Sequence, residues 1–401
     1  MNMFHFRLLI LTSVLFFIAC GQVNSQYREA VANINLSYLY NQNNSFSISA
    51  YSFTNKDSTS AILNIAGSNN VNAFEISYYE TNNLEQSPDA TTPLKATVNK
   101  GRISASVDIK DIKANYIVFI IQDLKTINAY VYPFFIPSKR IDTSIQPTVG
   151  ANNIPVVDKY VPVEKSMKFT SKKSKTDSLF INYYQHYFNP ASPPMSLSQQ
   201  LSKQLTISDQ YSVGVNKPIK LHKEGLYYIQ NDSTSDSGIA LRVQDSSFPR
   251  LKGIQQLIET SIYLCSKAEY ETLTSSLDKK NSFEQFWLRV TNSEVLAKRV
   301  IKHYYANVTK ANKLFTSYKE GWKTDMGMIY IIFGPPDQVY KKNNIEQWQY
   351  DKTSEYSKTT FEFIRLENTF SDSHYVLQRR AEYKPTWFRL VDLWRKGRKE
   401  M

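Results

Sequence analysis

Short runs in which apolar and polar residues alternate dominate the first part of the chain. One example is the series Phe46-x-Ile48-x-Ala50, and clusters of Asn, Ser, Thr and Gly separate such runs. Alternation at period two is typical of strands with one buried face, and polar clusters are typical of turns. The runs predict strands at residues 32–40, 45–53, 61–66, 73–79, 102–109, 116–122 and 128–135. This pattern predicts an immunoglobulin-like antiparallel β-sandwich over residues 28–145.

A second β-rich module is predicted over residues 146–248. Prolines punctuate residues 137–165, and this stretch is predicted to link the two modules. Strand-like runs follow at residues 178–184, 201–208, 225–229 and 239–243. The first part of the chain is therefore predicted to hold two antiparallel β-sandwich modules in tandem.

The pattern changes after residue 249, where apolar residues recur with helical spacing. Ser266 with Glu269, and Ser282 with Gln285, have the form of a capping box, which marks the first turn of a helix. A longer helix is predicted at residues 292–318, and strands at 328–333, 360–365 and 375–379. Residues 249–401 are therefore predicted to form an α+β domain, in which Cys265 is a buried, inert thiol.

Residues 1–19 have the pattern of an export signal. Arg7 precedes an apolar run at residues 8–19 that is too short to span a bilayer as a stable anchor. The run ends in Phe17-Ile18-Ala19-Cys20-Gly21, which resembles the lipobox of bacterial lipoproteins. The resemblance implies cleavage before Cys20, acylation of Cys20 and a lipid-anchored linker at residues 20–27. The alternative is an ordinary signal peptide cut nearby, for example after Ser25.

The residues after Cys20 also bear on location. No acidic residue occurs between Cys20 and Glu29. Surface-exposed lipoproteins of some bacteria resemble one another in carrying acidic residues directly after the cysteine. The expected location is therefore the bacterial outer membrane, by a lipid anchor, on the periplasmic face rather than the cell surface.

The composition excludes several classes of protein. Hydrophobic residues make up 42% of the 401 residues and charged residues 21%, so the chain can bury proper cores. Two cysteines exclude a disulfide framework, and the five histidines lack metal-ligand spacing. No GxSxG, HExxH, SxxK or P-loop pattern occurs. We therefore expect no metal, no cofactor and no catalytic residue. Although the net charge is +12, an exported chain is not expected to bind nucleic acid.

A cluster of special residues follows the long predicted helix. Gly321 is expected to end that helix in a left-handed conformation, and Trp322 to fold back as a buried anchor. Thr324 and Asp325 are expected to accept backbone N–H bonds in the next turn, where Gly327 takes a positive φ.

A second cluster lies a few residues further along. The Gly-Pro-Pro sequence at 334–336 is expected to stop the strand at 328–333, because neither proline can donate to a β-ladder. Asp337 is expected to cap the segment that follows. Trp348 and Tyr350 are spaced at period two, so they should lie on the same side of one strand.

Together the two clusters resemble the GWxTD domain, a family found on bacterial envelope proteins and without an established activity. The resemblance covers about residues 250–401. Residues 333–365 also resemble a small lipoprotein of the outer-membrane β-barrel assembly machinery. The positions that match the GWxTD pattern are Gly321, Trp322, Thr324, Asp325, Gly334, Pro335, Pro336, Asp337, Trp348 and Tyr350.

The C-terminal end is strongly basic. Residues 377–401 hold eight Lys or Arg and three Asp or Glu. A predicted last helix carries aromatic and aliphatic residues on one face, so it should dock through them and leave its bases in solvent. The alternative is contact with an acidic surface, such as anionic lipid, an acidic partner or a cell-wall polymer. The basic positions singled out are Arg395, Lys396, Arg398 and Lys399.

These patterns predict a non-enzymatic outer-membrane lipoprotein that serves as an accessory or scaffold subunit of a cell-envelope complex, in secretion, transport or β-barrel assembly. The expected partners are outer-membrane lipid, through acylated Cys20, and an envelope protein contacted by the GWxTD domain. One alternative is an envelope or cell-wall hydrolase that uses Asp325 and Asp337, joined by Lys323 or His303. Another is a surface lipoprotein that binds carbohydrate through its abundant Tyr and Trp.

Overall fold

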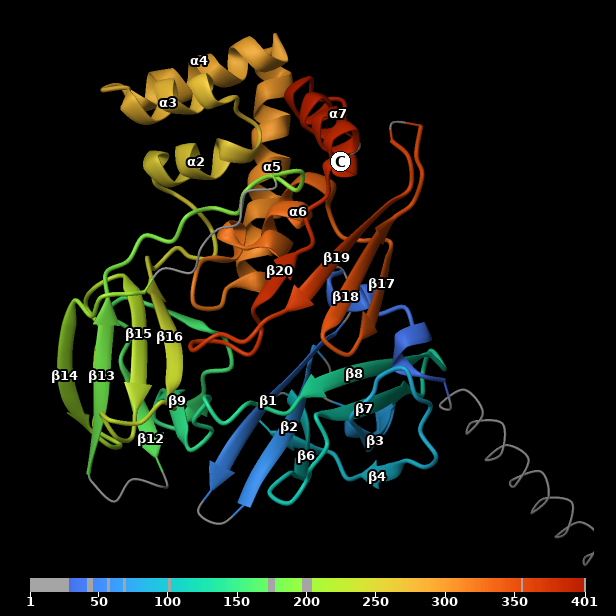
Figure 1. The fold of residues 1–401 in the computed structure, drawn as a ribbon. Coiled ribbons are helices and arrows are strands. Elements are labelled where there is room, and N and C mark those ends of the chain that lie inside the picture. The colour runs from blue at the N-terminus through green and yellow to red at the C-terminus, as the bar shows by residue number, and fades with distance from the viewer. Residues whose placement is uncertain are drawn as a thin grey trace, which may run out of the picture.

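The computed structural model describes residues 29–41, 46–55, 58–67, 70–99, 102–171, 177–196, 204–354 and 356–399. Two pairs of β-sheets are followed by a group of helices with a sheet of its own (Figure 1). Within those ranges no helix combines the length and the apolar character that a membrane span needs. The predicted export signal and Cys20 lie outside the described residues.

The first two sheets face each other across one core. Their strand orders are β1-β2-β6-β5 and β4-β3-β7-β8, and every pairing is antiparallel. Ile103, Ala105 and Val107 alternate with more exposed residues along β6, so one face of the strand fills the core. The bounds are β1 (Ser47–Asn55), β2 (Ser58–Ala66), β3 (Phe74–Thr81), β4 (Thr92–Leu94), β5 (Thr97–Asn99), β6 (Arg102–Asp108), β7 (Tyr116–Asp123) and β8 (Ala129–Phe135), with a 3₁₀ turn η3 (Val71–Ala73) before β3.

The predicted sandwich is confirmed, but its first predicted strand is wrong. Residues 32–40 form parts of two 3₁₀ turns, η1 (Val31–Asn33) and η2 (Ser37–Leu39), instead of a strand. The segment leaves the sandwich and contacts the C-terminal sheet, where the Leu36 N–H donates to the Val339 carbonyl at 2.8 Å. Its apolar residues fill an interface rather than one face of a sheet, and sequence periodicity does not separate these two cases.

Strand β7 is buried on both faces. Ile117, Phe119 and Ile121 belong to the core of the sandwich, whereas Tyr116 and Val118 belong to a larger core shared with the C-terminal region. A strand covered on both faces is a continuous apolar run rather than an alternating one. The sheet that contains β7 is therefore a middle layer between the sandwich core and the C-terminal region.

The next two sheets form a second sandwich. Their orders are β10-β9-β12 and β11-β16-β15-β13-β14, and β11 alone among these described strands pairs in parallel, with β16. Phe169 from one sheet and Ile229 from the other meet in a common core. The bounds are β9 (Ile145–Val149), β10 (Ile154–Pro155), β11 (Tyr160–Pro162), β12 (Met167–Ser171), β13 (Ser178–Tyr184), β14 (Asp209–Gly214), β15 (Gly225–Gln230) and β16 (Ile239–Gln244).

Two sequence predictions in this part are wrong. Residues 137–165 are not a plain linker, because they contain β9, β10 and β11. Pro155 is paired with Thr148 across β10 and β9, and Pro147 is paired with Phe169 across β9 and β12. The strand predicted at 201–208 is found instead at β14; residues 201–203 lie outside the described residues, and 204–208 are not a strand.

The C-terminal region combines helices with a sheet of order β17-β18-β19-β20. Ser266 caps α3 together with Glu269 as predicted, but the cap of α4 is Asp278, and Ser282 lies inside that helix. The bounds are α2 (Ile254–Thr260), η4 (Ser261–Tyr263), α3 (Lys267–Ser275), α4 (Lys279–Thr291), α5 (Glu294–Phe315), η5 (Gly321–Lys323), α6 (Asp325–Phe333), β17 (Gln338–Lys342), β18 (Ile345–Tyr350), β19 (Thr359–Arg365), β20 (Tyr375–Leu377), η6 (Ala381–Tyr383) and α7 (Lys384–Arg395).

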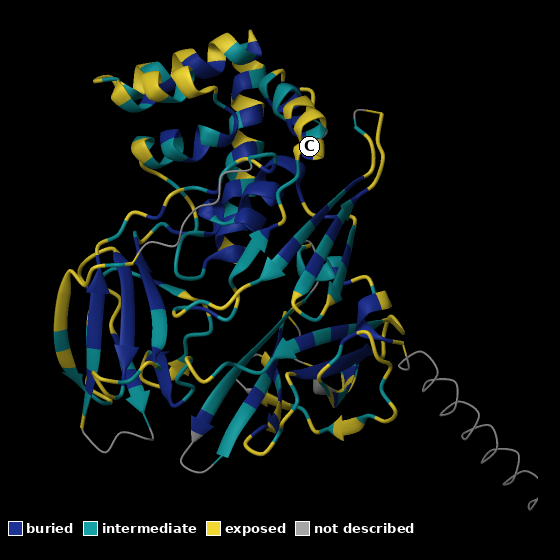
Figure 2. Ribbon diagram, in the orientation of Figure 1, coloured by how far each residue is buried: buried dark blue, intermediate teal, exposed yellow. Residues whose placement is uncertain are grey.

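Helix α6 occupies the place of the strand predicted at 328–333. Thr324 caps it, with its hydroxyl accepting the Gly327 N–H at 3.0 Å, and Asp325 stands in the first turn. All nine residues of α6 are buried, and a helix that is apolar all round belongs inside a core. In Figure 2, α6 is dark blue, whereas α3 and α4 carry exposed residues along their outer sides. The backbone ends the helix at Gly334, which has φ +92°.

Candidate functional site

Gly321 lies where the backbone of the motif comes closest to α5. Its N–H donates to the Thr316 hydroxyl at 2.9 Å, and the next N–H, of Trp322, donates to the Asn312 side-chain oxygen at 3.0 Å. A Cβ atom at position 321 would lie 2.1 Å from the Ala311 carbonyl oxygen. The predicted left-handed conformation is wrong, since Gly321 is not among the residues with positive φ. Glycine is required here by close approach of two backbones.

Gly327 makes the matching approach from the first turn of α6. A Cβ atom on Gly327 would lie 1.9 Å from the Gly321 carbonyl oxygen, which also accepts the Thr324 hydroxyl at 2.7 Å. The predicted positive φ at Gly327 is wrong, because the residue is helical. The two glycines therefore bring the turn η5 and helix α6 into direct contact.

Trp322 is the buried anchor that the sequence predicts. Its side chain is 4% exposed, and its ring lies edge-on to Tyr263 at 6.3 Å between centroids. The Tyr263 hydroxyl donates to the Trp322 carbonyl at 2.8 Å. These two contacts hold η5 against η4.

Asp325 is bound on both carboxylate oxygens. Its Oδ2 accepts the Leu377 N–H at 2.8 Å and Arg379 Nη1 at 3.2 Å, and its Oδ1 accepts Arg379 Nη2. Arg379 Nη2 also donates to the Ser192 carbonyl at 3.1 Å. The carboxylate therefore ties the start of α6 to the end of β20 and to the loop that follows β13. A buried bidentate pair of this kind holds its elements in one arrangement.

Lys323 belongs to a chain of buried charges that starts in the second sandwich. Arg242 on β16 lies 2.7 Å from Glu320, and Lys323 Nζ lies 3.2 Å from the other Glu320 oxygen. Burial would raise the pKa of Glu320, but the positive charges of Arg242 and Lys323 outweigh it and lower this pKa to about 2. Lys323 Nζ also lies 3.8 Å from the centroid of the Tyr187 ring. Lys323 therefore joins the motif to the second sandwich.

The second cluster ties the end of α6 to the C-terminal sheet. The Tyr350 hydroxyl donates to the Gly334 carbonyl at 2.9 Å, and Trp348 Nε1 donates to Glu346 at 2.8 Å. Trp348 and Tyr350 lie on one face of β18, as predicted, and both are buried there. The Asp337 carboxylate accepts the Asp351 N–H at 2.8 Å, just past the end of β18, and not, as predicted, an N–H of the segment that directly follows it. In the Gly-Pro-Pro sequence, Pro335 is exposed and Pro336 buried, and the pair follows a helix rather than a strand.

The N-terminal segment, residues 30–40, docks on this second cluster. Asn35 donates to the Asp337 carbonyl at 3.3 Å and accepts the Val339 N–H at 3.0 Å. Tyr40 packs on Trp348 at 4.8 Å between ring centroids, its hydroxyl donates to Glu346, and its carbonyl accepts the Tyr330 hydroxyl at 3.1 Å. The sequence offers no local signal for these contacts, because the partners are about 300 residues apart.

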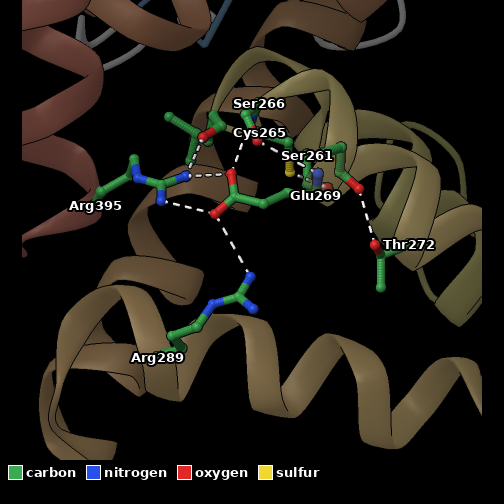
Figure 3. A network of polar contacts seen from close by, with 9 residues as sticks. Ser261, Cys265, Ser266, Glu269, Thr272, Arg289 and Arg395 are labelled. Atoms are coloured by element: carbon green, nitrogen blue, oxygen red, sulfur yellow. Dashed lines mark hydrogen bonds and ion pairs between the residues drawn. The ribbon is translucent and has the colours of Figure 1, made fainter.

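Three of the four basic positions near the C-terminus contact other groups of the chain, and the Lys396 pair among them lies at the surface. Arg395 forms a fork with Glu269, with both contacts at 2.9 Å, and donates to the Leu264 carbonyl at 2.8 Å (Figure 3). Hydrogen bonds from Arg395 are the largest cause that lowers the pKa of Glu269, and the Ser266 N–H adds to them. Together they outweigh the effect of partial burial, which would raise this pKa, and lower it to about 2. Lys396 contacts Asp392, and Lys399 donates to the Phe333 carbonyl. Arg398 is exposed.

An apolar groove of about 480 Å³ runs beside α7, next to the Trp322 anchor. Tyr263, Trp387, Phe388 and Val391 line it together with Lys384, and Phe388 is 54% exposed. Cys265 also lines the groove; burial raises the pKa of its thiol to about 11, which leaves it protonated at neutral pH. Neither Asp325 nor Asp337 lines this groove.

The arrangement leaves little room for acid–base chemistry at the motif. Asp325 and Asp337 each accept a backbone N–H, and Lys323 is 3% exposed in its side chain. His303 lies on α5, and among the described residues it contacts neither carboxylate. No three His, Cys, Asp or Glu side chains of the described ranges gather as a metal site. What the motif residues do is join α5, α6, β20 and the second sandwich.

The fold and site define a class of protein with two tandem β-sandwiches of mainly antiparallel strands and an α+β domain in which Gly321, Trp322, Lys323 and Asp325 are buried. Residues 225–396 match the family model of the GWxTD domain, which confirms the resemblance for the C-terminal region. Among solved structures, the chain is similar to the titin Ig tandem domains A164-A165, at 11% identity over 50% of this chain and 97% of that chain, with a TM-score of 0.16. No curated protein matches the chain.

Proposed function

We propose that this protein is a non-catalytic lipoprotein that serves as an accessory or scaffold subunit of a cell-envelope complex. The observation that carries the proposal is that the polar side chains of the motif are bound to other groups of the same chain. Thr324, Asp325 and Lys323 each bind groups inside the molecule, and Asp337 caps a backbone N–H. Motif side chains that bind groups inside the molecule stabilise its fold and are not available to a substrate. This use favours a rigid body that presents a binding surface over an enzyme.

The anchor in this proposal is acylated Cys20 on the periplasmic face of the outer membrane. Two or three acyl chains on one residue hold a protein firmly on a bilayer. Ala30, at the start of the docked segment, follows Cys20 by ten residues, so an extended chain spans at most about 35 Å between them. The anchor would therefore keep the GWxTD domain close to the membrane.

The partner surface in this proposal is the groove beside α7. Its apolar walls and the exposed Phe388 suit an aliphatic or aromatic side chain, and Lys384 suits an acidic group beside that side chain. The occupant is therefore a segment of an envelope protein that combines an apolar anchor residue with an acidic neighbour.

The test is cross-linking with mass spectrometry in intact cells that express the full chain. We expect the wild type to give one recurrent envelope partner, and Cys20→Ala to lose both membrane association and that partner. Phe388→Asp should lose the partner but keep the membrane association. Leu277→Asp is the matched control, because Leu277 is fully exposed on another surface loop, and it should keep both.

Four outcomes would count against the proposal. An unacylated, freely soluble native protein removes the anchor. Recovery of the lone protein in repeated experiments removes the scaffold role, and unchanged recovery with Phe388→Asp removes the groove as its contact surface. Hydrolysis of cell-wall material that stops in Asp337→Asn would favour the hydrolase instead, since this exposed residue can be changed without breaking a buried pair.

A further inference from the structure

An open cavity of about 390 Å³ lies where the first sandwich meets the second. It is bordered by β1, the edge strand of its sheet, and by β9 and β12 from the second sandwich (Figure 1). The strands are held together nearby, because the Thr54 N–H donates to the Thr143 carbonyl at 2.8 Å and the two hydroxyls lie 2.6 Å apart. Its volume falls within the range of about 300–1,000 Å³ that is usual for small-ligand sites.

Two aromatic rings of β1 form one wall of this cavity. Tyr51 and Phe53 are two positions apart, so they lie on the same face of the strand, and both are half-buried. Burial raises the pKa of Tyr51, so its hydroxyl stays protonated at neutral pH and can donate a hydrogen bond. The wall thus offers two ring faces and one phenolic donor.

The opposite wall offers hydrogen-bond acceptors that are already oriented. The Thr170 hydroxyl donates to the Gln146 carbonyl at 3.1 Å, and the Gln146 amide nitrogen donates to the Pro147 carbonyl at 3.2 Å. Ser171 likewise donates to Asn231 at 2.7 Å. Because these donors are used, the hydroxyl oxygens and the Gln146 Oε1 atom are left as acceptors.

Two exposed asparagines at the rim supply both donors and acceptors. Asn153 and Asn216 occupy turns with φ of +47° and +61°, a conformation that asparagine tolerates well. Among the described residues, neither side chain makes a hydrogen bond. Each carboxamide is therefore available to a ligand.

We infer that this cavity binds a neutral oligosaccharide. Among the described residues no charged side chain lines it, so within that part of the chain an anionic or cationic ligand finds no counter-charge. The weakly positive C–H faces of a sugar ring pack on the negative faces of aromatic rings. Sugar hydroxyls donate to the oriented oxygens of the β9–β12 wall and accept from the asparagine amides. The inference is independent of the proposed scaffold role, since the cavity is remote from the groove beside α7 and shares no lining residue with it.

Isothermal titration calorimetry of the purified full chain tests this inference. The probes are the neutral trisaccharides chitotriose, cellotriose, maltotriose and mannotriose, with trigalacturonate as the anionic comparison. We expect at least one neutral trisaccharide to bind, and Tyr51→Ala or Asn153→Ala to raise its Kd about tenfold or more. Tyr270→Ala is the matched control, because Tyr270 is a partly exposed tyrosine on α3, and it should leave the Kd unchanged.

Thermal unfolding of each variant establishes that it is folded before titration. Absence of binding by every neutral probe overturns the inference. Binding that survives both Tyr51→Ala and Asn153→Ala places the saccharide elsewhere and overturns the assignment of this cavity. Stronger binding of trigalacturonate overturns the preference for a neutral ligand.

Discussion

Glu269 and Glu320 are acidic side chains that stay ionised well below their ordinary titration range. The pKa of each is about 2, against a reference of 4.5. Hydrogen bonds from Arg395 lower the pKa of Glu269, and the charges of Arg242 and Lys323 lower that of Glu320 against the effect of burial. A carboxyl group whose pKa is lower in the folded state stabilises the fold at pH values above its unfolded pKa.

We predict that stability falls as the pH drops from about 4.5 to about 2, the interval in which these two groups protonate. Each group should account for about 2–3 kcal/mol of the free energy of unfolding. Glu269→Gln should be less stable than the wild type at pH 7, and its stability should change less across this interval. Urea denaturation at pH 7, 4.5 and 3 measures both.

Glu271→Gln is the matched control for this prediction. Glu271 lies on the same helix, is 65% exposed in its side chain and has its nearest ionic partner at 3.9 Å. The control should follow the wild-type curve within about 0.5 kcal/mol. A Glu269→Gln curve parallel to the wild type would show that the fork with Arg395 contributes nothing to the acid sensitivity.

The residues of the motif differ in how far the sequence could predict them. Trp322 is buried as predicted, because burial favours a large aromatic side chain. Trp348 and Tyr350 share one face of β18 as predicted, because side chains alternate along a strand with period two. The partner of Asp325 could not be predicted, because Arg379 lies 54 residues away and is brought near by tertiary structure alone. Asn312 did carry a signal, as a polar residue on the apolar face of the long predicted helix.

Helix α6 shows where hydrophobic pattern fails at the level of elements. A short, continuous apolar run fits a buried strand and a buried helix equally well. The decisive signal is Thr324 followed by Asp325, a pair that has the form of a helix N-terminus as well as that of a turn. The sandwich strands were easier to predict, because one solvent-facing side makes them alternate.

We predict that Gly327→Ala destabilises the fold by about 3 kcal/mol, since the new methyl group would overlap the Gly321 carbonyl oxygen at 1.9 Å. Urea denaturation, followed by far-UV circular dichroism, measures the loss. Gly253→Ala is the control, because its Cβ would have no neighbour closer than 3.5 Å, and it should lose about 1 kcal/mol or less. If the two variants lose the same free energy of unfolding, the close approach of η5 and α6 does not require glycine at position 327.

At the scale of the whole molecule, the C-terminal region packs on the outer faces of both sandwiches. Val118 and Val131 of the first sandwich share its main core, and Tyr228 of the second packs with Tyr318 and Phe370. The GWxTD match begins at residue 225, the first residue of β15, and so includes Arg242 on β16, the partner of Glu320. The sequence pattern predicts the separate modules but not these contacts between them. An apolar strand face has the same pattern whether it packs on the other sheet of its own sandwich or on another domain.

The N-terminal segment is the element that closes this assembly. Leu36 is 1% exposed and donates to the C-terminal sheet, while Tyr38 accepts the Val131 N–H of the first sandwich at 2.7 Å. Tyr40 then packs on Trp348 and Phe315. Residues 30–40 thus contact both the middle sheet and the GWxTD domain. Loss of these contacts should therefore destabilise both parts.

We predict that Leu36→Ala and Tyr40→Ala each lower the free energy of unfolding by about 3 kcal/mol, because each empties a buried site between two parts of the molecule. Hydrogen exchange should quicken at the Val339 amide, whose acceptor is Asn35, and along β7, while α3 and α4 keep their wild-type rates. Leu277→Ala, at a fully exposed position, should change neither quantity. If exchange quickens uniformly over the chain, the segment stabilises the fold as a whole. If it quickens nowhere, the segment does not couple the two parts. A contact whose side chains can be removed without changing the exchange rates of either part contributes no coupling between them.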